Sequence, residues 1–451
     1  MKIYNFILEL DSKRHNSFDE ISIILTLGQS GFAVVVLVTI TLMASALWSF
    51  KDTMAQPQIK DSSLEVEVVA EGLSEPTSMT FLNNNSILVT EKSGSVRLVS
   101  NWVLSDEPIL KIDVRTESER GLLGIDSMNG NQVYLYFSQT SPLGSVLNKI
   151  YKYDWDGRQL INPISILDLP GEPGPNHNGG KLLISGESTN NAFLYAVIGD
   201  LNHNGMLQNL KDGNQPDNTS VIVRVNAENG TAAAGNPFAN SSRSMANISD
   251  AKSNYFAYGI RNSFGLAIDP LTGILWDTEN GADMFDEINI VRPGFNSGWQ
   301  IVMGPIADAG VIVKDLVMFP SSHYEDPLLS WRSPPALTAL EFLNSSKLGE
   351  SYTNNLFVGD YNWGTLYYFI INEQRNDINL DNFRVRGTLS DRVIDTPEKQ
   401  SAITFGTGFG RISDIKTGPD GLLYILSYGD GRIYRLSPLP KVIKIHQPYD
   451  L

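Results

Sequence analysis

The hydrophobic positions after residue 64 recur as short apolar runs that are separated by turns rich in Gly, Asp and Asn. In one repeat the runs 87–90 and 96–99 flank a Ser-Gly turn, and in another the runs 422–426 and 433–436 flank a Gly-Asp-Gly turn. Aromatic and β-branched residues bounded by such turns are typical of antiparallel hairpins. No long amphipathic helix pattern is present, so the pattern predicts an all-β domain.

Six of these hairpin units can be counted, with strands that begin near residues 87, 133, 193, 273, 356 and 422. Six related units at irregular spacing favour radial repetition, which is the architecture of a β-propeller. A two-sheet β-sandwich is the alternative, but it does not explain why Pro-Asp-Gly and Pro-Leu-Thr-Gly turns precede a Leu-Tyr or Leu-Trp strand. In a propeller, the loops at one mouth carry the functional side chains.

The first fifty residues have a different character. No charge occurs between Glu20 and Lys51, and residues 31–50 form an apolar stretch. That length matches the about 20 residues that a helix needs to cross a bilayer. We therefore expect a transmembrane anchor at 31–50, after an N-terminal cytoplasmic segment at 1–30.

Lys2, Lys13 and Arg14 precede the apolar stretch, against Lys51 and Lys60 after it. This excess favours a cytoplasmic N-terminus and a single-pass membrane protein whose main domain is extracellular. Cleavage at the small residues 44–46 would instead release a secreted protein. The sequence further predicts a polar linker at 51–63, a propeller domain at 64–437 and a C-terminal tail at 438–451.

Composition narrows the function classes. The 451 residues include 50 acidic and 34 basic side chains, for a net charge of −16, and 42% are hydrophobic. An acidic chain with no basic face disfavours nucleic acid as a partner. The absence of cysteine excludes disulfides, thiolate metal sites and a cysteine nucleophile.

Three polar segments contain candidate functional residues. The first places His177, one of only five histidines, among Asn and Gly residues that favour tight turns. Histidine can take or give a proton near neutral pH, although a His in a Gly-rich turn is often a plain loop residue. The second segment is 258–265, which contains Arg261 and Asn262, and the third is 279–287.

These segments resemble the soluble PQQ-dependent sugar dehydrogenases, the glucose/sorbosone dehydrogenase family. The resemblance covers about residues 64 to 437 and implies six blades of four strands, in agreement with the count of hairpins. The matching motifs lie in the same order along the chain at 119–124, 177–182, 198–200, 258–270, 286–299, 410–414 and 418–421.

The resemblance implies the site residues. His177 would remove a proton from the anomeric hydroxyl of an aldose while hydride passes to PQQ. Arg261 and Asn262 would hold the quinone oxygens and stabilise the charge that develops there. Further cofactor contacts would come from Glu119, Asn176, Asn362 and Arg411. Guanidinium matches carboxylate geometry, but each arginine could instead pair with an acid, and Glu119 could be a surface carboxylate.

The family also carries calcium. The backbone carbonyls of Gly281 and Ala282 match the site that bridges PQQ and the protein, where calcium would act as a Lewis acid. Glu287 and the carbonyl of Ser297 match a second, structural site. The acidic residues around Glu287 alone do not establish a metal site.

Several positions depart from the family pattern. Asn176 stands where an Asp precedes the histidine in the glucose enzymes, and Asn362 stands where some relatives have a cofactor-binding Lys. Ser413 replaces a second Arg after Arg411, and Leu201 replaces a polar cofactor contact. Together these changes remove up to two positive charges from a site for a trianion.

The first hypothesis is an exported, membrane-tethered propeller that oxidises aldoses with PQQ and calcium and passes electrons to an unknown acceptor. The second is a non-catalytic recognition propeller, since a fold does not determine a function. Retention of His177, Arg261 and Asn262 argues against it, whereas the lost cations argue for it. The third is a calcium-dependent lactonase, which would need carboxylates around a metal at the channel centre.

Overall fold

The computed structural model describes residues 56–186, 191–239, 251–382 and 389–440. The chain divides into two units, 1–55 and 56–451, and all described residues belong to the second. The predicted cytoplasmic segment 1–30 and transmembrane segment 31–50 therefore lie outside the described residues, as does most of the predicted tail. Within the described ranges, no helix is long and apolar enough to cross a membrane.

The described strands form six mainly antiparallel sheets, here called blades. Blade 1 consists of β3 (Pro76–Asn83), β4 (Ser86–Glu91), β5 (Ser95–Ser100), β6 (Val103–Leu104) and β7 (Leu110–Lys111). Blade 2 consists of β8 (Leu122–Met128), β9 (Gln132–Thr140), β10 (Val146–Trp155) and β11 (Leu160–Pro170). Blade 3 consists of β12 (Leu182–Ser185), β13 (Phe193–Ile198), β14 (Val221–Asn226), β15 (Tyr255–Tyr258) and β19 (Phe295–Asn296).

The other three blades follow the same plan. Blade 4 consists of β16 (Ser263–Ile268), β17 (Leu275–Glu279), β18 (Asp286–Val291), β20 (Leu329–Trp331) and β24 (Val393–Ile394). Blade 5 consists of β21 (Leu337–Phe342), β22 (Leu356–Asp360), β23 (Leu366–Phe369), β25 (Thr404–Thr407) and β1 (Gln58–Ile59). Blade 6 consists of β26 (Ile412–Thr417), β27 (Leu423–Ser427), β28 (Arg432–Pro438) and β2 (Leu64–Glu71).

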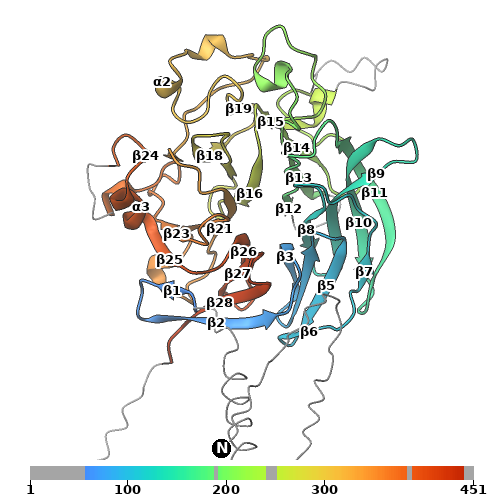
Figure 1. Ribbon diagram of the computed structural model, residues 1–451, viewed down its shortest axis with the longest axis vertical. Helices are drawn as coiled ribbons and strands as arrows, with labels where there is room; N and C mark the ends of the chain where they lie inside the picture. Colours follow the sequence, from blue (N-terminus) through green and yellow to red (C-terminus); the bar gives the residue numbers. More distant parts are fainter. Residues whose placement is uncertain (1–55, 187–190, 240–250, 383–388, 441–451) are drawn as a thin grey trace, which may run out of the picture. The chain divides into compact units, whose positions relative to one another are not determined.

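The first strands of the blades surround the centre of the domain in the order β3, β8, β12, β16, β21 and β26, and β26 neighbours β3 again (Figure 1). This closed ring confirms the predicted six-bladed propeller and excludes the two-sheet sandwich. The six strands expected from the hydrophobic pattern are β4, β9, β13, β17, β22 and β27, which are the second strands of the six blades. Nearly every residue of these strands is buried, because each blade packs between two neighbours.

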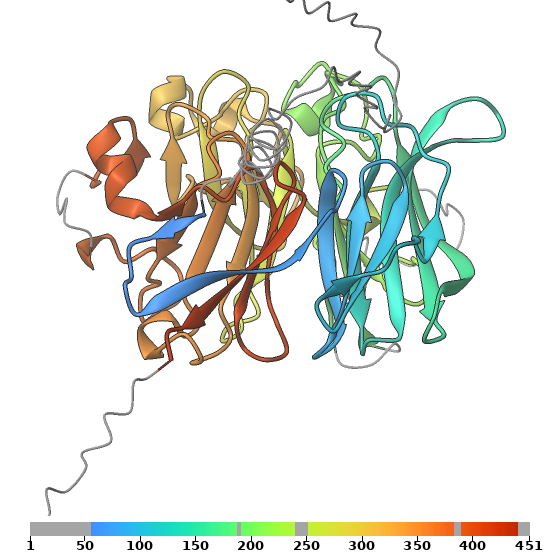
Figure 2. The same ribbon diagram turned by 60° about the horizontal axis from the view of Figure 1, so that its bottom comes forward.

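Two segments from the start of the domain join sheets made of C-terminal strands. β2 pairs antiparallel with β28 from Leu64 opposite Pro438 onward, and Figure 2 shows blue β2 beside red β28. This pairing closes the ring by joining the two ends of the domain. β1 pairs with β25 in blade 5. The prediction of a linker over 51–63 is therefore wrong for residues 58–59, whose backbone groups are paired in a sheet.

Helices are few and short in the part of the chain that the structure describes. They are α2 (Ile306–Ala309), α3 (Pro397–Ile403), and the 3₁₀ turns η2 (Met206–Gln208), η3 (Ala251–Asn254), η4 (Val313–Asp315), η5 (Glu350–Tyr352) and η6 (Leu380–Asn382). This agrees with the absence of long amphipathic patterns in the sequence.

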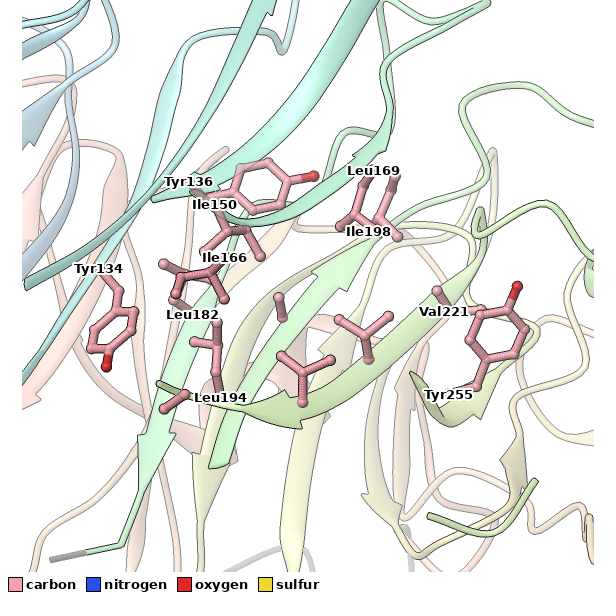
Figure 3. Packing of buried hydrophobic residues seen from close by; sticks show 14 of the residues in the cluster. Tyr134, Tyr136, Ile150, Ile166, Leu169, Leu182, Leu194, Ile198, Val221 and Tyr255 are labelled. Carbon is pink, nitrogen blue, oxygen red and sulfur yellow. The ribbon is translucent and has the colours of Figure 1, made fainter. Parts of the chain in front are cut away.

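The hydrophobic core between blades 2 and 3 positions the loop that carries His177. Tyr136, Ile150 and Leu169 of blade 2 pack with Leu182 and Ile198 of blade 3 (Figure 3). The hydroxyl of Tyr136 is buried with its ring and donates a hydrogen bond to the backbone oxygen of Asn178, at 2.8 Å. A buried tyrosine usually satisfies its hydroxyl in this way, and here the partner is the residue next to His177.

Candidate functional site

The predicted site residues gather at one mouth of the propeller because of the antiparallel blade plan. In such a blade, the start of the first strand and the turn between the second and third strands lie at the same end. Glu119, His177, Asn262 and Arg411 each stand shortly before the first strand of a blade, namely β8, β12, β16 and β26. Gly281 lies in the turn between β17 and β18, which are the second and third strands of blade 4.

A cavity of about 320 Å³ occupies the centre of the ring at this mouth. All six blades, or the loops before them, contribute to its lining. The lining residues are Thr77, Ser78, Lys92, Ser118, Glu119, Leu123, Gly179, Lys181, Phe264, Ala336, Thr338, Tyr361, Ser413 and Tyr428. The hollow is therefore axial, which is where a propeller presents a ligand to loops from every blade.

Glu119 joins the predicted catalytic residues to this cavity. Its Oε2 accepts a hydrogen bond from the backbone N–H of His177 at 2.7 Å and another from Nδ2 of Asn262 at 2.9 Å. The Oδ1 of Asn262 in turn accepts a hydrogen bond from the N–H of Gly179, at 3.2 Å. Blades 2, 3 and 4 thus meet at one carboxylate, so Glu119 is not a surface residue with a capping role.

His177 is oriented by a neighbour that the sequence reasoning left without a role. Its Nδ1 lies 2.6 Å from Oδ1 of Asp200, whose Oδ2 accepts a hydrogen bond from Nε1 of Trp299 at 2.7 Å. Because the carboxylate can only accept, Nδ1 carries the proton and the lone pair of a neutral imidazole stands on Nε2. No described residue bonds Nε2, so this nitrogen is free to accept a proton from a ligand.

Glycines allow the three site loops to approach closely. His177 itself has a φ of 60°, in the left-handed region, and a Cβ on Gly179 would lie 2.5 Å from the backbone oxygen of Val197. A Cβ on Gly199 would lie 2.5 Å from the backbone oxygens of both His177 and Arg261. Only glycine fits between them, and the strained His177 conformation is typical of a functional loop.

Arg261 is held from two sides, yet it keeps donors free. Its Nη1 donates to the backbone oxygen of Asn280 at 2.9 Å, and its guanidinium carbon lies 5.3 Å from the centre of the Trp299 ring. Its Nε is buried without a hydrogen-bond partner. Arg261 forms no ion pair among the described residues. The alternative interpretation, in which Arg261 only pairs with an acidic side chain, is therefore wrong. The hydrogen bond from Arg261 to Asn280 also places the turn that contains Gly281 and the exposed Ala282 beside Arg261.

A buried group of carboxylates lies behind Arg261. Glu279 and Glu287 are directly opposite each other on β17 and β18, and the hydroxyl of Ser297 donates to Oε2 of Glu279. Burial raises the pKa of Glu279 to about 7, and it raises the pKa values of Asp277 and Glu287 well above their usual range, with neighbouring acids adding to the effect. Like charges opposed in a sheet are unfavourable without a counter-charge.

This arrangement fits a bound cation. Both carboxylate oxygens of Asp277 are buried without a hydrogen-bond partner, an arrangement that a cation would relieve. Among the described residues, no three His, Cys, Asp or Glu side chains are placed to hold a metal by themselves. A cation here would therefore need carbonyl oxygens as well as Glu287, which calcium accepts. The carboxyl of Asp286 accepts instead from the backbone N–H groups of Gly281, at 3.0 Å, and Leu337, at 3.1 Å.

The remaining predicted cofactor contacts lie across the mouth or to its side. The guanidinium carbon of Arg411 lies 5.1 Å from the centre of the Tyr361 ring, and no acid pairs with Arg411 among the described residues. Asn362 is exposed, and its amide donates to the backbone oxygen of Pro334 at 3.4 Å. The side-chain oxygen of Asn176 accepts a hydrogen bond from the hydroxyl of Ser118.

Four residues of the site had no role in the reasoning from sequence. Asp200 and Trp299 lie within the matching segments 198–200 and 286–299, so a signal for them was present. Glu279 began the third polar segment. Asp277, by contrast, is a charged residue inside an apolar strand, and only the three-dimensional structure shows that it lies near Glu279 and Glu287.

Comparison with known proteins identifies the family of this chain. Residues 73–435 match the Glucose / Sorbosone dehydrogenase family. Aldose sugar dehydrogenase YliI of Escherichia coli K12 is 26% identical over 412 residues, which cover 89% of this chain and 98% of the relative.

Solved structures show the same fold. A Thermus thermophilus oxidoreductase described as a glucose dehydrogenase has a TM-score of 0.62 and 27% identity, covering 83% of this chain and 99% of that chain. The PQQ-bound aldose sugar dehydrogenase of Streptomyces coelicolor has a TM-score of 0.59 and 22% identity, covering 85% and 99%. This chain belongs to the glucose/sorbosone dehydrogenase family.

Proposed function

We propose that this protein is a PQQ-dependent aldose sugar dehydrogenase. The observation that carries the proposal is the hydrogen bond between His177 and Asp200, because it leaves a basic nitrogen free. His177 is joined to the axial cavity through Glu119, which lines the cavity and accepts a hydrogen bond from the His177 backbone. When bound, PQQ supplies the quinone that accepts a hydride from the anomeric carbon of the sugar. The remaining chemistry belongs to the side chains around the cavity.

His177 takes the hydroxyl proton at Nε2. Asp200 holds the ring in the required tautomer and stabilises the imidazolium that forms. Arg261 and Asn262 would hold the quinone oxygens, and Arg261, which forms no ion pair among the described residues, would supply a charge-assisted hydrogen bond. Glu119 fixes the distance between His177 and Asn262 through its two hydrogen bonds.

We also propose two calcium sites. The carbonyls of Gly281 and Ala282 would hold one ion next to Arg261 and the cofactor. Glu287, with the carbonyl of Ser297, would hold the second beside the desolvated Glu279. The buried, unpartnered carboxylate of Asp277 supports this second site.

Membrane attachment through residues 31–50, with the propeller outside the cell, stays a prediction from the sequence, as does release of a cleaved form.

Reconstitution tests the function. The purified full-length chain is mixed with PQQ and calcium, and the quinone absorbance is followed on addition of a panel of aldoses. We expect reduction of the quinone by at least one aldose. A protein that binds PQQ but shows no absorbance change with any sugar would instead be a recognition propeller.

A further inference from the structure

Charged side chains from several blades stand at this mouth of the propeller, and among them Lys92, Glu119 and Lys181 line the axial cavity. Glu119, His177 and Arg261 stand at blades 2, 3 and 4, whereas Lys92 and Arg411 stand at blades 1 and 6. In a ring of six, blade 1 lies opposite blade 4 and blade 6 lies opposite blade 3. Lys92 therefore faces the Arg261 side across the cavity, and Arg411 faces the His177 side.

The backbone of Lys92 is fixed between two blades. It lies in the turn between β4 and β5, where its N–H donates to the oxygen of Glu75 at 3.0 Å and its oxygen accepts from the N–H of Leu122 at 3.1 Å. A Cβ at Gly121 would lie 2.7 Å from Cγ of Lys92, so glycine there leaves room for the lysine side chain. The partly exposed side chain lines the cavity.

Lys92 brings to the cavity a charge that no acid neutralises. Its Nζ donates to the backbone oxygen of Thr116 at 3.0 Å, and it forms no ion pair among the described residues. Lys181 also lines the cavity but differs in this respect, because it is buried and paired with Asp414. Of these two lysines, only Lys92 has a free charge for an anionic ligand.

The wall beside Lys92 and Arg411 is aromatic and suits a flat ligand. The rings of Tyr361 and Tyr428 have centroids 5.5 Å apart, and both line the cavity. The hydroxyl of Tyr428 donates to Glu75 at 2.7 Å, which keeps that ring in place. Planar aromatic faces and cations on one side fit a planar polycarboxylate.

We propose that Lys92, together with Arg411, forms the anion-binding end of the cavity and holds the carboxylates of PQQ there. This inference rests on the proposed function. It explains how a trianion is held although Asn362 and Ser413 stand at positions where relatives have cations. The quinone end of the cofactor then lies on the side of His177, Arg261 and Asn262.

Equilibrium binding of PQQ tests the proposal without reference to turnover. The purified full-length protein, with calcium, is titrated with PQQ and the bound cofactor is measured by absorbance. We expect Lys92→Gln to weaken binding about tenfold, the usual effect of losing a hydrogen bond to a charged group. Lys92→Arg should bind within a few-fold of the wild type, and the salt dependence of binding should be smaller in Lys92→Gln.

The matched control is Lys347→Gln. Lys347 is exposed and lies between β21 and β22, the first and second strands of blade 5, and so at the opposite end of the propeller. The Lys347→Gln substitution removes the same charge as Lys92→Gln and should leave the affinity for PQQ unchanged. Adding Asn362→Lys to Lys92→Gln should restore part of the affinity, which a merely structural role of Lys92 does not predict.

The outcomes separate the two proposals. If the wild type binds PQQ and Lys92→Gln behaves like Lys347→Gln, the assignment of Lys92 is wrong and the proposed function stands. If the wild type does not bind PQQ in the presence of calcium, both are wrong. An unfolded Lys92→Gln protein is recognised by its thermal melt, and the Lys92→Glu variant, tested against Lys347→Glu, then decides the question.

Discussion

The Oε2 atom of Glu119 accepts a hydrogen bond from the backbone N–H of His177 at 2.7 Å, although the two residues are 58 positions apart in the chain. The bond ties the loop before blade 2 to the loop before blade 3. The same oxygen also accepts from Asn262 of blade 4. The position of the proposed base therefore depends on a carboxylate that also lines the cavity.

Glu119→Gln should preserve this junction, because the amide oxygen of Gln can accept the same two hydrogen bonds. It removes a negative charge beside an anionic cofactor, so we expect PQQ binding to tighten several-fold. Glu119→Ala removes the acceptor, and we expect turnover to fall about tenfold or more, because a misplaced catalytic group is costly. Titration with PQQ and steady-state rates measure both effects. If Gln were as damaging as Ala, the charge of Glu119 would itself be needed.

Asp200→Asn should impair catalysis but leave cofactor binding intact. Asp200 accepts hydrogen bonds from both His177 and Trp299, whereas an Asn can accept on only one side. If its amide nitrogen faces His177, the imidazole proton moves to Nε2 and the basic lone pair is lost. We expect kcat to fall by about 10²–10⁴, the usual effect of losing a positioned base. His177→Ala should cost a similar factor, and the double variant should be no worse. Additive losses would show that the two residues act separately.

The propeller architecture could be predicted from the sequence because its strands and turns follow from local patterns of apolar and turn-forming residues. The second strands, such as β22 and β27, are buried on both faces and appear in the sequence as continuous apolar runs. The pairing of β2 with β28 could not be predicted from local pattern, because it joins residues 64 and 438. For the same reason β1 appeared to be part of a polar linker.

The site was predicted unevenly. His177 and Arg261 stand in glycine-rich turns, and the motif order around them identified the family. Lys92 carries no such signal, since a lysine in a hairpin turn is usually a solvated residue. Its role depends on the cavity and on the absence of an acidic partner among the described residues, and both are properties of the folded ring.

Removal of calcium should destabilise the protein. The buried acids Glu279 and Glu287 repel each other, and a bound cation offsets this repulsion. A ligand that binds only the folded state stabilises it by about 2.7 kcal/mol at 100 times its Kd. We expect excess chelator to lower the Tm and to abolish turnover, and calcium to restore both. Glu287→Gln should melt at a temperature that chelator changes less. An unchanged melt and rate in chelator would remove both proposed sites.

The predicted topology can be tested on intact cells. If residues 31–50 anchor the protein with its propeller outside, an added protease should cleave the chain after Phe50 without lysis. A tag placed ahead of residue 1 should stay protected until the cells are lysed. Immunoblots against the tag and the propeller distinguish the two ends. Complete protection of the propeller in intact cells would show that the orientation is wrong.

The ion pair between Lys181 and Asp414 joins blade 3 to blade 6 across the centre of the ring. Both side chains are buried, and Asp414 also accepts hydrogen bonds from the hydroxyl of Ser78 at 2.7 Å and the N–H of Met79 at 2.9 Å. Burial alone would raise the pKa of Asp414, but the charges of Lys181 and Lys416, with these hydrogen bonds, lower it below its usual value.

Lys181→Met should therefore leave a buried carboxylate without its closest cation, at a cost of about 3–5 kcal/mol in the free energy of unfolding.

Because the folded pKa of Asp414 is depressed, its stabilisation is present above the unfolded pKa of about 3.9 and is lost as the pH falls through the lower folded pKa. As the pH falls, Lys181→Met should lose less of its free energy of unfolding than the wild type, because Asp414 is more easily protonated in the variant. Urea unfolding at neutral and acidic pH measures both effects. The double variant Lys181→Met, Asp414→Leu should lose less than the sum of the single changes. Equal stability of Lys181→Met and the wild type at pH 7 would show that the ion pair contributes nothing to the closed ring.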